Sequence, residues 1–288
     1  MEMYPHILND KQATIRHIVE KLGKASNDFT DNLARIKTRR VADKKWLAAG
    51  VILLLFFRET KEKAAQRNGE FVFQLIKRSQ QVSQGGDLSC PGGILEPGKD
   101  CFLCRFITHR FPPIFRGDSR RFARKRGKEM FRGISLFTAN ALRESWEEVG
   151  LSPFNVTFLG PLPCYTLTLF TKTIFPVVGM VKNEAPFRLN GGEVEKVVEI
   201  PLKTFFDRES YGIYSLDTSD EFQKRNARHW DFPCLIHRDH DGTEEILWGA
   251  TFNIIMSFFK IVFDVDLSEI RSTRTIKRTL QTDYLTGK

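Results

Sequence analysis

The strongest constraint on the fold is a run of twelve apolar residues, WLAAGVILLLFF, from Trp46 to Phe57. A membrane-spanning helix needs about 20 such residues, whereas this run ends at an arginine and a glutamate. The segment is therefore predicted to be a buried strand. The polar stretch RETKEKAAQRNG follows it and leads into EFVFQLIKRS, in which apolar residues alternate. This pattern indicates a second strand and a charged hairpin that turns at Asn68-Gly69.

The rest of the chain divides into short predicted elements. Residues 1–40 place apolar side chains at helical spacing and are predicted to form an N-terminal helical extension. The segments FNVTFLG, IFPVVGMV and EKVVEIPL are typical of short strands, HRDHDGTEE contains an Asp241-Gly242 turn, and WGATFNIIMSFFKIV is predicted to be a largely buried helix. We expect a main domain over residues 41–265 and a C-terminal tail over 266–288.

Composition is that of an ordinary globular protein, with 288 residues, 41% apolar and 27% charged. Five cysteines, an odd number, favour reduced thiols over a disulfide framework. We expect no membrane-spanning segment. Neither end shows a recognisable targeting pattern, so a cytoplasmic location is expected.

The segment ALRESWEEVGL, residues 141–151, concentrates acidic residues at helical spacing. A helix over 136–149 is predicted, with Ser135 as its N-cap and Gly150 just past its end in the left-handed conformation. Glu144, Glu147 and Glu148 then stand three or four residues apart and project toward one patch.

Such a patch is costly unless a cation neutralises it, and oxygen-only ligation suits Mg²⁺ or Mn²⁺. Glu144, Glu147 and Glu148 are the predicted metal ligands. Arg143, four residues before Glu147, can orient it by a charge-assisted hydrogen bond. The alternative is a solvated acidic helix face without a ligand.

Upstream, the segment LSCPGGILEPGKD has the character of a tight loop that lets the backbone approach a ligand closely at Gly92 and Gly93. Together, this loop and the pattern R-E-x-x-x-E-E-x-G, from Arg143 to Gly150, resemble the signature of the Nudix hydrolases. The resemblance implies an α+β protein with the Nudix fold, a mixed β-sheet sandwiched between α-helices. It also implies a metal-dependent pyrophosphohydrolase.

Two features depart from the family pattern. Lys99 stands where the family has a Glu or Asp, so that a ligand is either missing or supplied by the neighbouring Asp100. In addition, the loop and the helix are separated by roughly 36 more residues than is usual. This insertion, residues 101–134, holds ten basic residues against Asp118 and Glu129, a net charge of +8 in a chain of +9: Arg105, Arg110, Arg116, Arg120, Arg121, Arg124, Lys125, Arg126, Lys128 and Arg132.

The insertion admits three interpretations. Its basic residues would concentrate an anionic substrate at a neighbouring active site, or they belong to a solvated loop. Nucleic-acid binding is a third option, because the phenylalanines that alternate with them are able to stack on bases: Phe111, Phe115, Phe122 and Phe131. The Cys101-x-x-Cys104 motif is a weak candidate for zinc binding, and idle or buried thiols are favoured.

Over residues 46–265 the chain is similar to the coenzyme A diphosphatase branch of the Nudix hydrolases, notably in LIKRSQQVSQGGDLSCPGG, RLNGGEVEKVVEIPL and LWGATFNIIM. The resemblance implies hydrolysis of coenzyme A or acyl-coenzyme A to 3′,5′-ADP and 4′-phosphopantetheine. It suggests Glu193 as general base, Arg78 as a phosphate contact together with the loop at Gly92 and Gly93, and Tyr165 as a core or adenine-stacking residue.

Two rival functions remain open. A Nudix hydrolase of NADH, ADP-ribose or capped RNA would share the same metal site. A catalytically silent binding module is conceivable because the positive charge of Lys99 would repel a metal ion.

Overall fold

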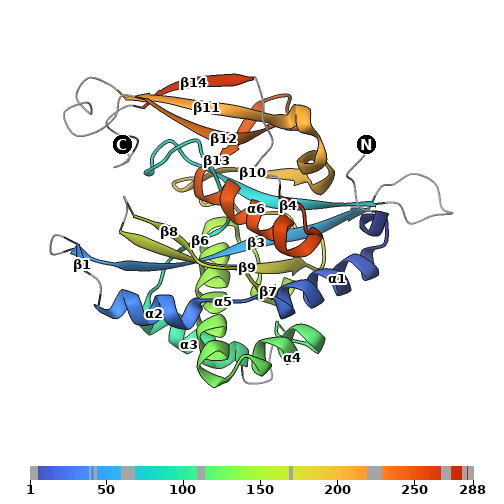
Figure 1. The fold of residues 1–288 in the computed structure, drawn as a ribbon, viewed down its shortest axis with the longest axis vertical. Coiled ribbons are helices and arrows are strands. Elements are labelled where there is room, and N and C mark those ends of the chain that lie inside the picture. Colours follow the sequence, from blue (N-terminus) through green and yellow to red (C-terminus); the bar gives the residue numbers. More distant parts are fainter. Residues whose placement is uncertain are drawn as a thin grey trace.

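The computed structural model describes residues 6–38, 40–41, 44–59, 69–108, 114–168, 171–218, 229–266, 274–280 and 284. Its strands form three sheets (Figure 1). The largest contains β3 (Leu47–Glu59), β4 (Gly69–Arg78), β5 (Leu88–Ser89), β6 (Gly92–Ile94), β7 (Val156–Pro161), β8 (Tyr165–Leu167), β9 (Lys172–Val181) and β10 (Val194–Pro201). A C-terminal sheet contains β11 (Tyr211–Thr218), β12 (His229–Arg238), β13 (Glu244–Trp248) and β14 (Thr275–Leu280), and β1 (Arg40–Val41) pairs with β2 (Lys44–Lys45).

Helices cover both faces of the largest sheet. They are α1 (Lys11–Lys24), α2 (Phe29–Thr38), α3 (Pro97–Thr108), α4 (Gly117–Lys125), α5 (Lys128–Val149) and α6 (Gly249–Phe263), with short 3₁₀ turns η1 (His6–Asn9), η2 (Pro153–Asn155), η3 (Leu202–Phe206) and η4 (Arg208–Ser210). Within the described residues, no helix is both long and apolar enough to cross a membrane.

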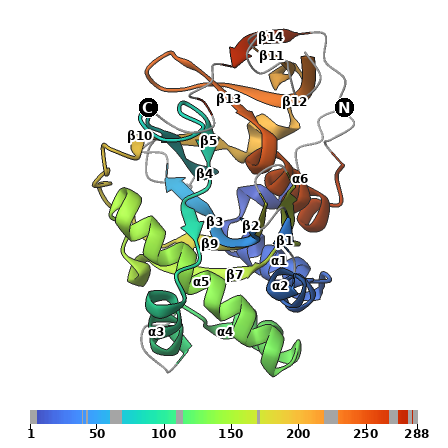
Figure 2. The same ribbon diagram turned by 90° about the vertical axis from the view of Figure 1, so that its left-hand side faces the viewer.

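The largest sheet separates two apolar cores. On one face α1 and α6 pack against the sheet, and the cluster includes Ile18, Leu53 and Phe258. On the other face α5 and α2 cover the strands, with Phe29, Ile52 and Phe137 in the cluster. Figure 2 shows α5 and α6 on opposite sides of the strands. The run that is apolar throughout is therefore β3, a central strand buried on both faces.

Strand β3 also positions the glycine loop. Its second half pairs with β4, whereas its first half pairs with β6, so that Gly50 lies opposite Gly93 and Val51 opposite Gly92. On its other side β3 runs parallel to β9, where Gly50 is in register with Phe175. The sheet is therefore mixed, as expected, and the end of the sheet at Gly50 carries the glycine loop.

The strand predictions are confirmed for β3, β4, β7, β9 and β10, and the predicted C-terminal helix is α6. Asn68, which was predicted to lie in the hairpin turn, is outside the described residues. Residues 6–38 contain the helices α1 and α2. In the segment expected to be a tail, β14 pairs in parallel with β11.

One prediction about the acidic helix is wrong. The helix begins at Lys128 rather than near residue 136, and Gly127 is its N-cap. Ser135 lies inside the helix, fully buried, where its hydroxyl donates to the carbonyl of Phe131 at 2.8 Å. The inserted residues thus lengthen α5 at its start. Ser135 was a misleading N-cap signal, because its hydroxyl bonds within the helix instead.

The described residues of the insertion are mainly helical and do not form a solvated loop. They form α3, α4 and the first turns of α5, and they bury Ile107, Ile114 and Phe115 in the core under α5. Because Phe115 packs against Phe131 and Phe158, it cannot stack on bases. Phe111 lies outside the described residues.

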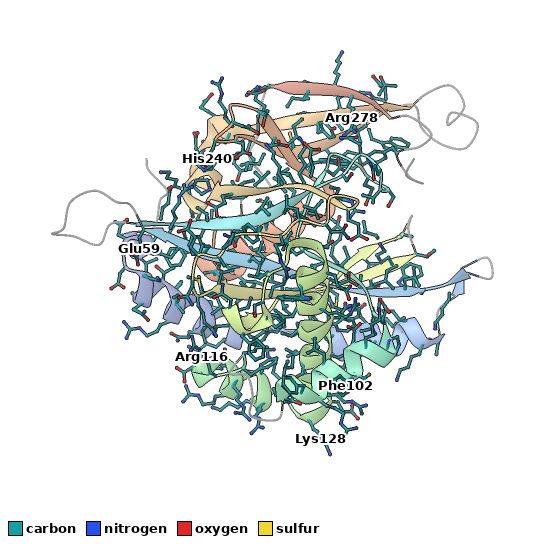
Figure 3. All side chains as sticks on the ribbon, turned by 180° about the vertical axis from the view of Figure 1, so that it is seen from behind. Glu59, Phe102, Arg116, Lys128, His240 and Arg278 are labelled. Atoms are coloured by element: carbon teal, nitrogen blue, oxygen red, sulfur yellow. The ribbon has the colours of Figure 1, made fainter. Side chains whose placement is uncertain are left out.

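The basic residues of α4 lie far from the acidic patch. Lys128 precedes Glu144 by 16 residues on one helix, which is about 24 Å at 1.5 Å per residue. Figure 3 shows Arg116 and Lys128 at the opposite end of the molecule from the C-terminal sheet. Arg126 donates to the carbonyls of Leu22 and Gly23 at the end of α1. These charges therefore belong to the packing of α4 on α1 and to the surface around it.

Candidate active site

The acidic patch lies in the last turns of α5, and Gly150 ends the helix as predicted. Gly150 has a φ of 69°, and its N–H donates to the carbonyl of Trp146 at 3.0 Å. Glycine adopts this left-handed conformation without the steric cost that a side chain would bring. The helix therefore ends directly after Glu147, Glu148 and Val149.

Arg143 is the hub of the acidic patch. It is 8% exposed, and each nitrogen of its guanidinium donates to a different carboxylate: Nε to Asp100 at 2.7 Å, Nη1 to Glu147 at 2.6 Å and Nη2 to Glu144 at 2.8 Å. Burial alone would lower the pKa of Arg143, but these acidic partners raise it. Arg143 therefore stays charged and orients the glutamates, as the sequence predicted.

Asp100 is a buried anchor and not a metal ligand. It is fully buried, and besides Arg143 it accepts hydrogen bonds from the backbone N–H of Glu96 at 2.7 Å and from Nδ2 of Asn140 at 3.0 Å. Because its oxygens are occupied in this way, Asp100 does not replace the metal ligand that is missing at position 99. It holds the first turn of α3 against α5.

Asn140 is a site residue that the sequence patterns missed. Its side-chain oxygen accepts from the N–H of Gly50 at 2.7 Å, while its Nδ2 group donates to Asp100 and to the carbonyl of Ile94. One amide thus joins α5, β3 and the segment after the glycine loop. One sequence signal could have pointed to Asn140: it stands three residues before Arg143, on the same face of the helix.

The glycine loop fits against the glutamates because it has no side chains. Gly92 has a φ of 148°, and its N–H donates to Oε2 of Glu148 at 3.0 Å. A Cβ on Gly93 would lie 2.5 Å from the carboxylate of Glu144. The two predicted loop glycines are therefore required at these positions, one by its backbone and the other by the space that Glu144 occupies.

Burial raises the pKa values of the two glutamates that face this loop. Glu148 is 6% exposed, and its pKa rises to about 8, mainly through burial and in part through the charge of Glu144. The pKa of Glu144 is also raised by burial, although Arg143 opposes the rise. Glu147 differs, since its side chain is 44% exposed on the neighbouring side of the helix.

Two residues assigned by resemblance lie near Glu148. Glu193 is exposed, and its charge contributes to the raised pKa of Glu148, whereas the charge of Arg78 opposes the rise. The carbonyl of Glu193 accepts from the N–H of Ser79, next to Arg78. The structure thus brings Arg78 and Glu193 to the buried end of the acidic patch.

Lys99 lies at the rim of the patch, because its partner Glu96 is also 3.4 Å from Arg143. Its ammonium group is paired with Glu96 at 2.9 Å, and its side chain is 62% exposed. Tyr165 is partly buried against the core on the α6 face, and its hydroxyl accepts from Asn253 at 3.3 Å. All five cysteines, including Cys101 and Cys104, are free.

The donor set suits a hard divalent cation, although the carboxylates are held by other partners. Among the residues that the structure describes, no three acidic, histidine or cysteine side chains already form a metal-binding group. The reason is local: Arg143 holds Glu144 and Glu147, and the Gly92 N–H holds Glu148. Carboxylate oxygens are the ligands that Mg²⁺ and Mn²⁺ prefer, and a cation would offset the cost of burying two negative charges.

Comparisons with known proteins agree with the geometry of this site. No family model matches the chain. Part of the chain is nevertheless similar to Nudix hydrolases. It is 34% identical over 116 residues to an uncharacterised Nudix hydrolase, NudL, of Pectobacterium atrosepticum, with 40% of this chain and 53% of that protein covered.

A second relative is the peroxisomal coenzyme A diphosphatase NUDT7 of Mus musculus. The identity is 28% over 131 residues, which cover 44% of this chain and 51% of that protein. The chain thus spans about half the length of the curated relatives that it matches.

Solved structures give weaker likenesses. A MutT/nudix family protein from Enterococcus faecalis is 13% identical with a TM-score of 0.39, over 88% of this chain and 75% of that one. An Ap4A hydrolase of C. elegans is 15% identical with a TM-score of 0.31, over 55% of this chain and 81% of that one. The similarity to Nudix hydrolases therefore rests on the sequence matches.

Proposed function

We propose that this protein is a metal-dependent pyrophosphohydrolase that cleaves coenzyme A or acyl-coenzyme A into 3′,5′-ADP and the corresponding 4′-phosphopantetheine. The observation that carries the proposal is the placement of Glu144 and Glu148 against the side-chain-free loop at Gly92 and Gly93. The named activity of the mouse relative supports the choice of coenzyme A.

The acidic patch would hold the metal through Glu144, Glu147 and Glu148. A bound Mg²⁺ or Mn²⁺ neutralises phosphate charge and lowers the pKa of a coordinated water. Glu144 and Glu147 would exchange part of their contact with Arg143 for the cation, and Arg143, still anchored by Asp100, would keep both glutamates in place. Arg143 is therefore a positioning residue, because its burial keeps it from the substrate.

The reaction adds one water across the diphosphate. The water oxygen forms a bond to one phosphorus, the bond from that phosphorus to the bridging oxygen breaks, and the bridging oxygen leaves on the other phosphate. We assign Glu193 as the base that takes the proton from the water, because it is exposed and its charge acts on Glu148. Arg78 is in register with Val194, next to Glu193, and its guanidinium is suited to bind a phosphate.

The rival binding-module function is less well supported because the charge of Lys99 is neutralised by its partner Glu96. The other Nudix substrates stay open as outcomes of the test. A cytoplasmic location belongs to the same proposal.

The test is release of 3′,5′-ADP from coenzyme A with Mg²⁺, with Mn²⁺ and with EDTA, next to NADH, ADP-ribose and capped RNA. We expect metal-dependent release from coenzyme A, reduced by about 100-fold or more in Glu148→Gln. Glu129→Gln is the matched control, because Glu129 is exposed in the first turn of the same helix. Preferred cleavage of another compound would refute the substrate assignment, and no metal-dependent cleavage of any compound would refute the enzyme.

A further inference from the structure

A cavity outside the acidic patch lies between α1, α4 and β7. Its volume is about 860 Å³, within the range of about 300–1,000 Å³ that is typical of small-molecule sites. Strand β7 is at the edge of the largest sheet, and Figure 1 shows it next to both helices. Neither the glycine loop nor the glutamates of the acidic patch line this cavity. It is therefore a candidate site separate from the active site.

The cavity combines buried apolar walls with a basic opening. Val19 of α1, Leu159 of β7 and Met180 of β9 are among the buried residues that line it. Its charged residues are exposed or partly exposed, and six basic residues stand against two acidic ones, a net charge of +4: Lys11, Arg16, Lys24, Arg116, Arg121 and Lys182 against Glu20 and Asp118. These walls and charges together suit an anion with an apolar portion.

The two acidic residues do not neutralise the basic opening. Asp118 is paired with Arg121 at 3.1 Å, and Glu20 is paired with Lys24. Within the described part of the chain, three of the remaining basic residues have no carboxylate within 4.0 Å: Arg16, Arg116 and Lys182. The cavity therefore keeps positive charge that a ligand could neutralise.

Two of these cations, Arg116 and Lys182, are near enough to repel each other. Lys182 follows β9, and its ammonium group donates to the carbonyl of Phe154 at 2.5 Å. Burial and then the charge of Arg116 lower the pKa of Lys182. Arg116 is also the N-cap of α4, whose first turn lines the cavity and has no side-chain cap. Because the first N–H groups of a helix favour anions, one anionic group could bind both cations and this helix start.

Thr157 adds a buried polar group without a partner. It lies in β7 opposite Met180, and both residues line the cavity. Thr157 is 9% exposed, and its hydroxyl has no hydrogen-bond partner among the described residues. An unpaired buried hydroxyl lowers stability. A ligand in the cavity would supply the missing partner.

We propose that this cavity binds a nucleotide-like polyphosphate, a molecule with several phosphate charges on an apolar ring. The phosphates would lie at Arg116, Lys182 and the first turn of α4, and the ring would lie against the apolar walls, within reach of the Thr157 hydroxyl. A fatty acid fits less well, because its single charge would leave most of the basic opening unmatched. The site shares no residue with the proposed active site, so the inference does not depend on the proposed function.

The first test measures binding of ATP by calorimetry, with EDTA present so that no metal draws phosphates to the acidic patch. Arg116→Gln and Lys182→Met each remove one cation, and Thr157→Val removes the hydroxyl while it keeps the shape of the side chain. Lys125→Gln is the matched control, because Lys125 is an exposed cation in the last turn of α4 that does not line the cavity.

We expect ATP to bind about tenfold or more weakly to Arg116→Gln and to Lys182→Met than to the wild type, and about threefold or more weakly to Thr157→Val. Lys125→Gln should match the wild type. Inorganic triphosphate should bind more weakly than ATP, because it has no apolar portion, and laurate should not displace ATP. Absence of ATP binding, or ATP binding that all three cavity variants leave unchanged, would overturn the proposal. Binding of laurate in preference to ATP would overturn the choice of a polyphosphate.

The second test separates a ligand-binding role of Thr157 from a structural one. Without ATP, the thermal midpoint of Thr157→Val should be equal to or higher than that of the wild type, because the variant loses an unpaired hydroxyl. Thr14→Val is the contrast: the buried Thr14 hydroxyl donates to the carbonyl of Ile7 at 2.5 Å, so its loss should lower the midpoint. ATP should raise the midpoint of the wild type more than that of Thr157→Val. A lower midpoint of Thr157→Val without ATP, or an equal rise with ATP in both proteins, would count against the proposal.

Discussion

Replacing Glu148 by glutamine is expected to stabilise the metal-free protein at alkaline pH and to leave its stability nearly unchanged at acidic pH. Burial and the nearby charge of Glu144 raise the pKa of Glu148 from 4.5 to about 8. One pKa unit corresponds to about 1.4 kcal/mol. Ionised Glu148 therefore destabilises the folded state by on the order of 5 kcal/mol, a large fraction of the 5–15 kcal/mol typical of a whole domain.

The direction of the effect follows from proton linkage. Because the pKa of Glu148 is higher in the folded chain than in the unfolded chain, the folded chain binds the proton more tightly. The stabilising contribution of this carboxyl is complete below about pH 4.5 and is lost as the pH rises through about 8. Glutamine cannot ionise, and its side-chain oxygen can still accept from the Gly92 N–H, so the variant escapes this loss.

The assay is urea unfolding with EDTA at about pH 5 and about pH 9, for the wild type, Glu148→Gln and Glu147→Gln. The free energies of unfolding should agree at pH 5, whereas Glu148→Gln should exceed the wild type by several kcal/mol at pH 9. Glu147 is half exposed, so its variant should differ from the wild type by less than about 1 kcal/mol. A difference at pH 9 that is no larger for Glu148→Gln than for Glu147→Gln would refute the reasoning.

Three further predictions follow from the same geometry. Gly93→Ala should lower metal-dependent turnover about tenfold or more without unfolding the chain, because the added Cβ would lie 2.5 Å from the Glu144 carboxylate; kinetics and the thermal midpoint check this. Arg143→Lys should cost about 3 kcal/mol in urea unfolding, since lysine cannot donate in three directions from a fixed plane. Arg121→Gln combined with Lys125→Gln should leave KM for coenzyme A within about twofold, because α4 leads into the start of α5, and Lys128 there lies about 24 Å from Glu144 along the helix. A salt-dependent rise in KM would contradict this.

Local sequence patterns, which involve residues close together in the chain, were sufficient to predict much of the fold and part of the site. The continuous apolar run from Trp46 to Phe57 requires a strand that is buried on both faces, and β3 has this place. Gly150 ends α5 as predicted because the left-handed conformation is a local requirement. The spacing of Glu144 and Glu148 likewise follows from the helix itself.

The partners that hold the site could not be predicted because they are distant in the sequence. Asp100 looked like a substitute ligand beside Lys99, yet it is the buried partner of Arg143, 43 residues further along the chain. Asn140 bonds to Gly50, 90 residues before it. Charge counting placed the basic insertion next to the glutamates in the sequence, whereas the helical rise of α5 separates Lys128, at its start, from them in space.

The long insertion is compatible with an intact site because the site is held together by contacts at the two ends of the inserted segment. Asp100, at its start, bonds to Arg143 and Asn140, just beyond its end. Closing a longer loop costs only about 0.6 kcal/mol for each doubling of its length, so even a fivefold longer connection costs on the order of 1 to 2 kcal/mol. Burial of Ile107, Ile114 and Phe115 offsets this cost, at about 1.5–3 kcal/mol for each side chain. The geometry of the acidic patch therefore depends on these hydrogen bonds and not on the length of the chain between them.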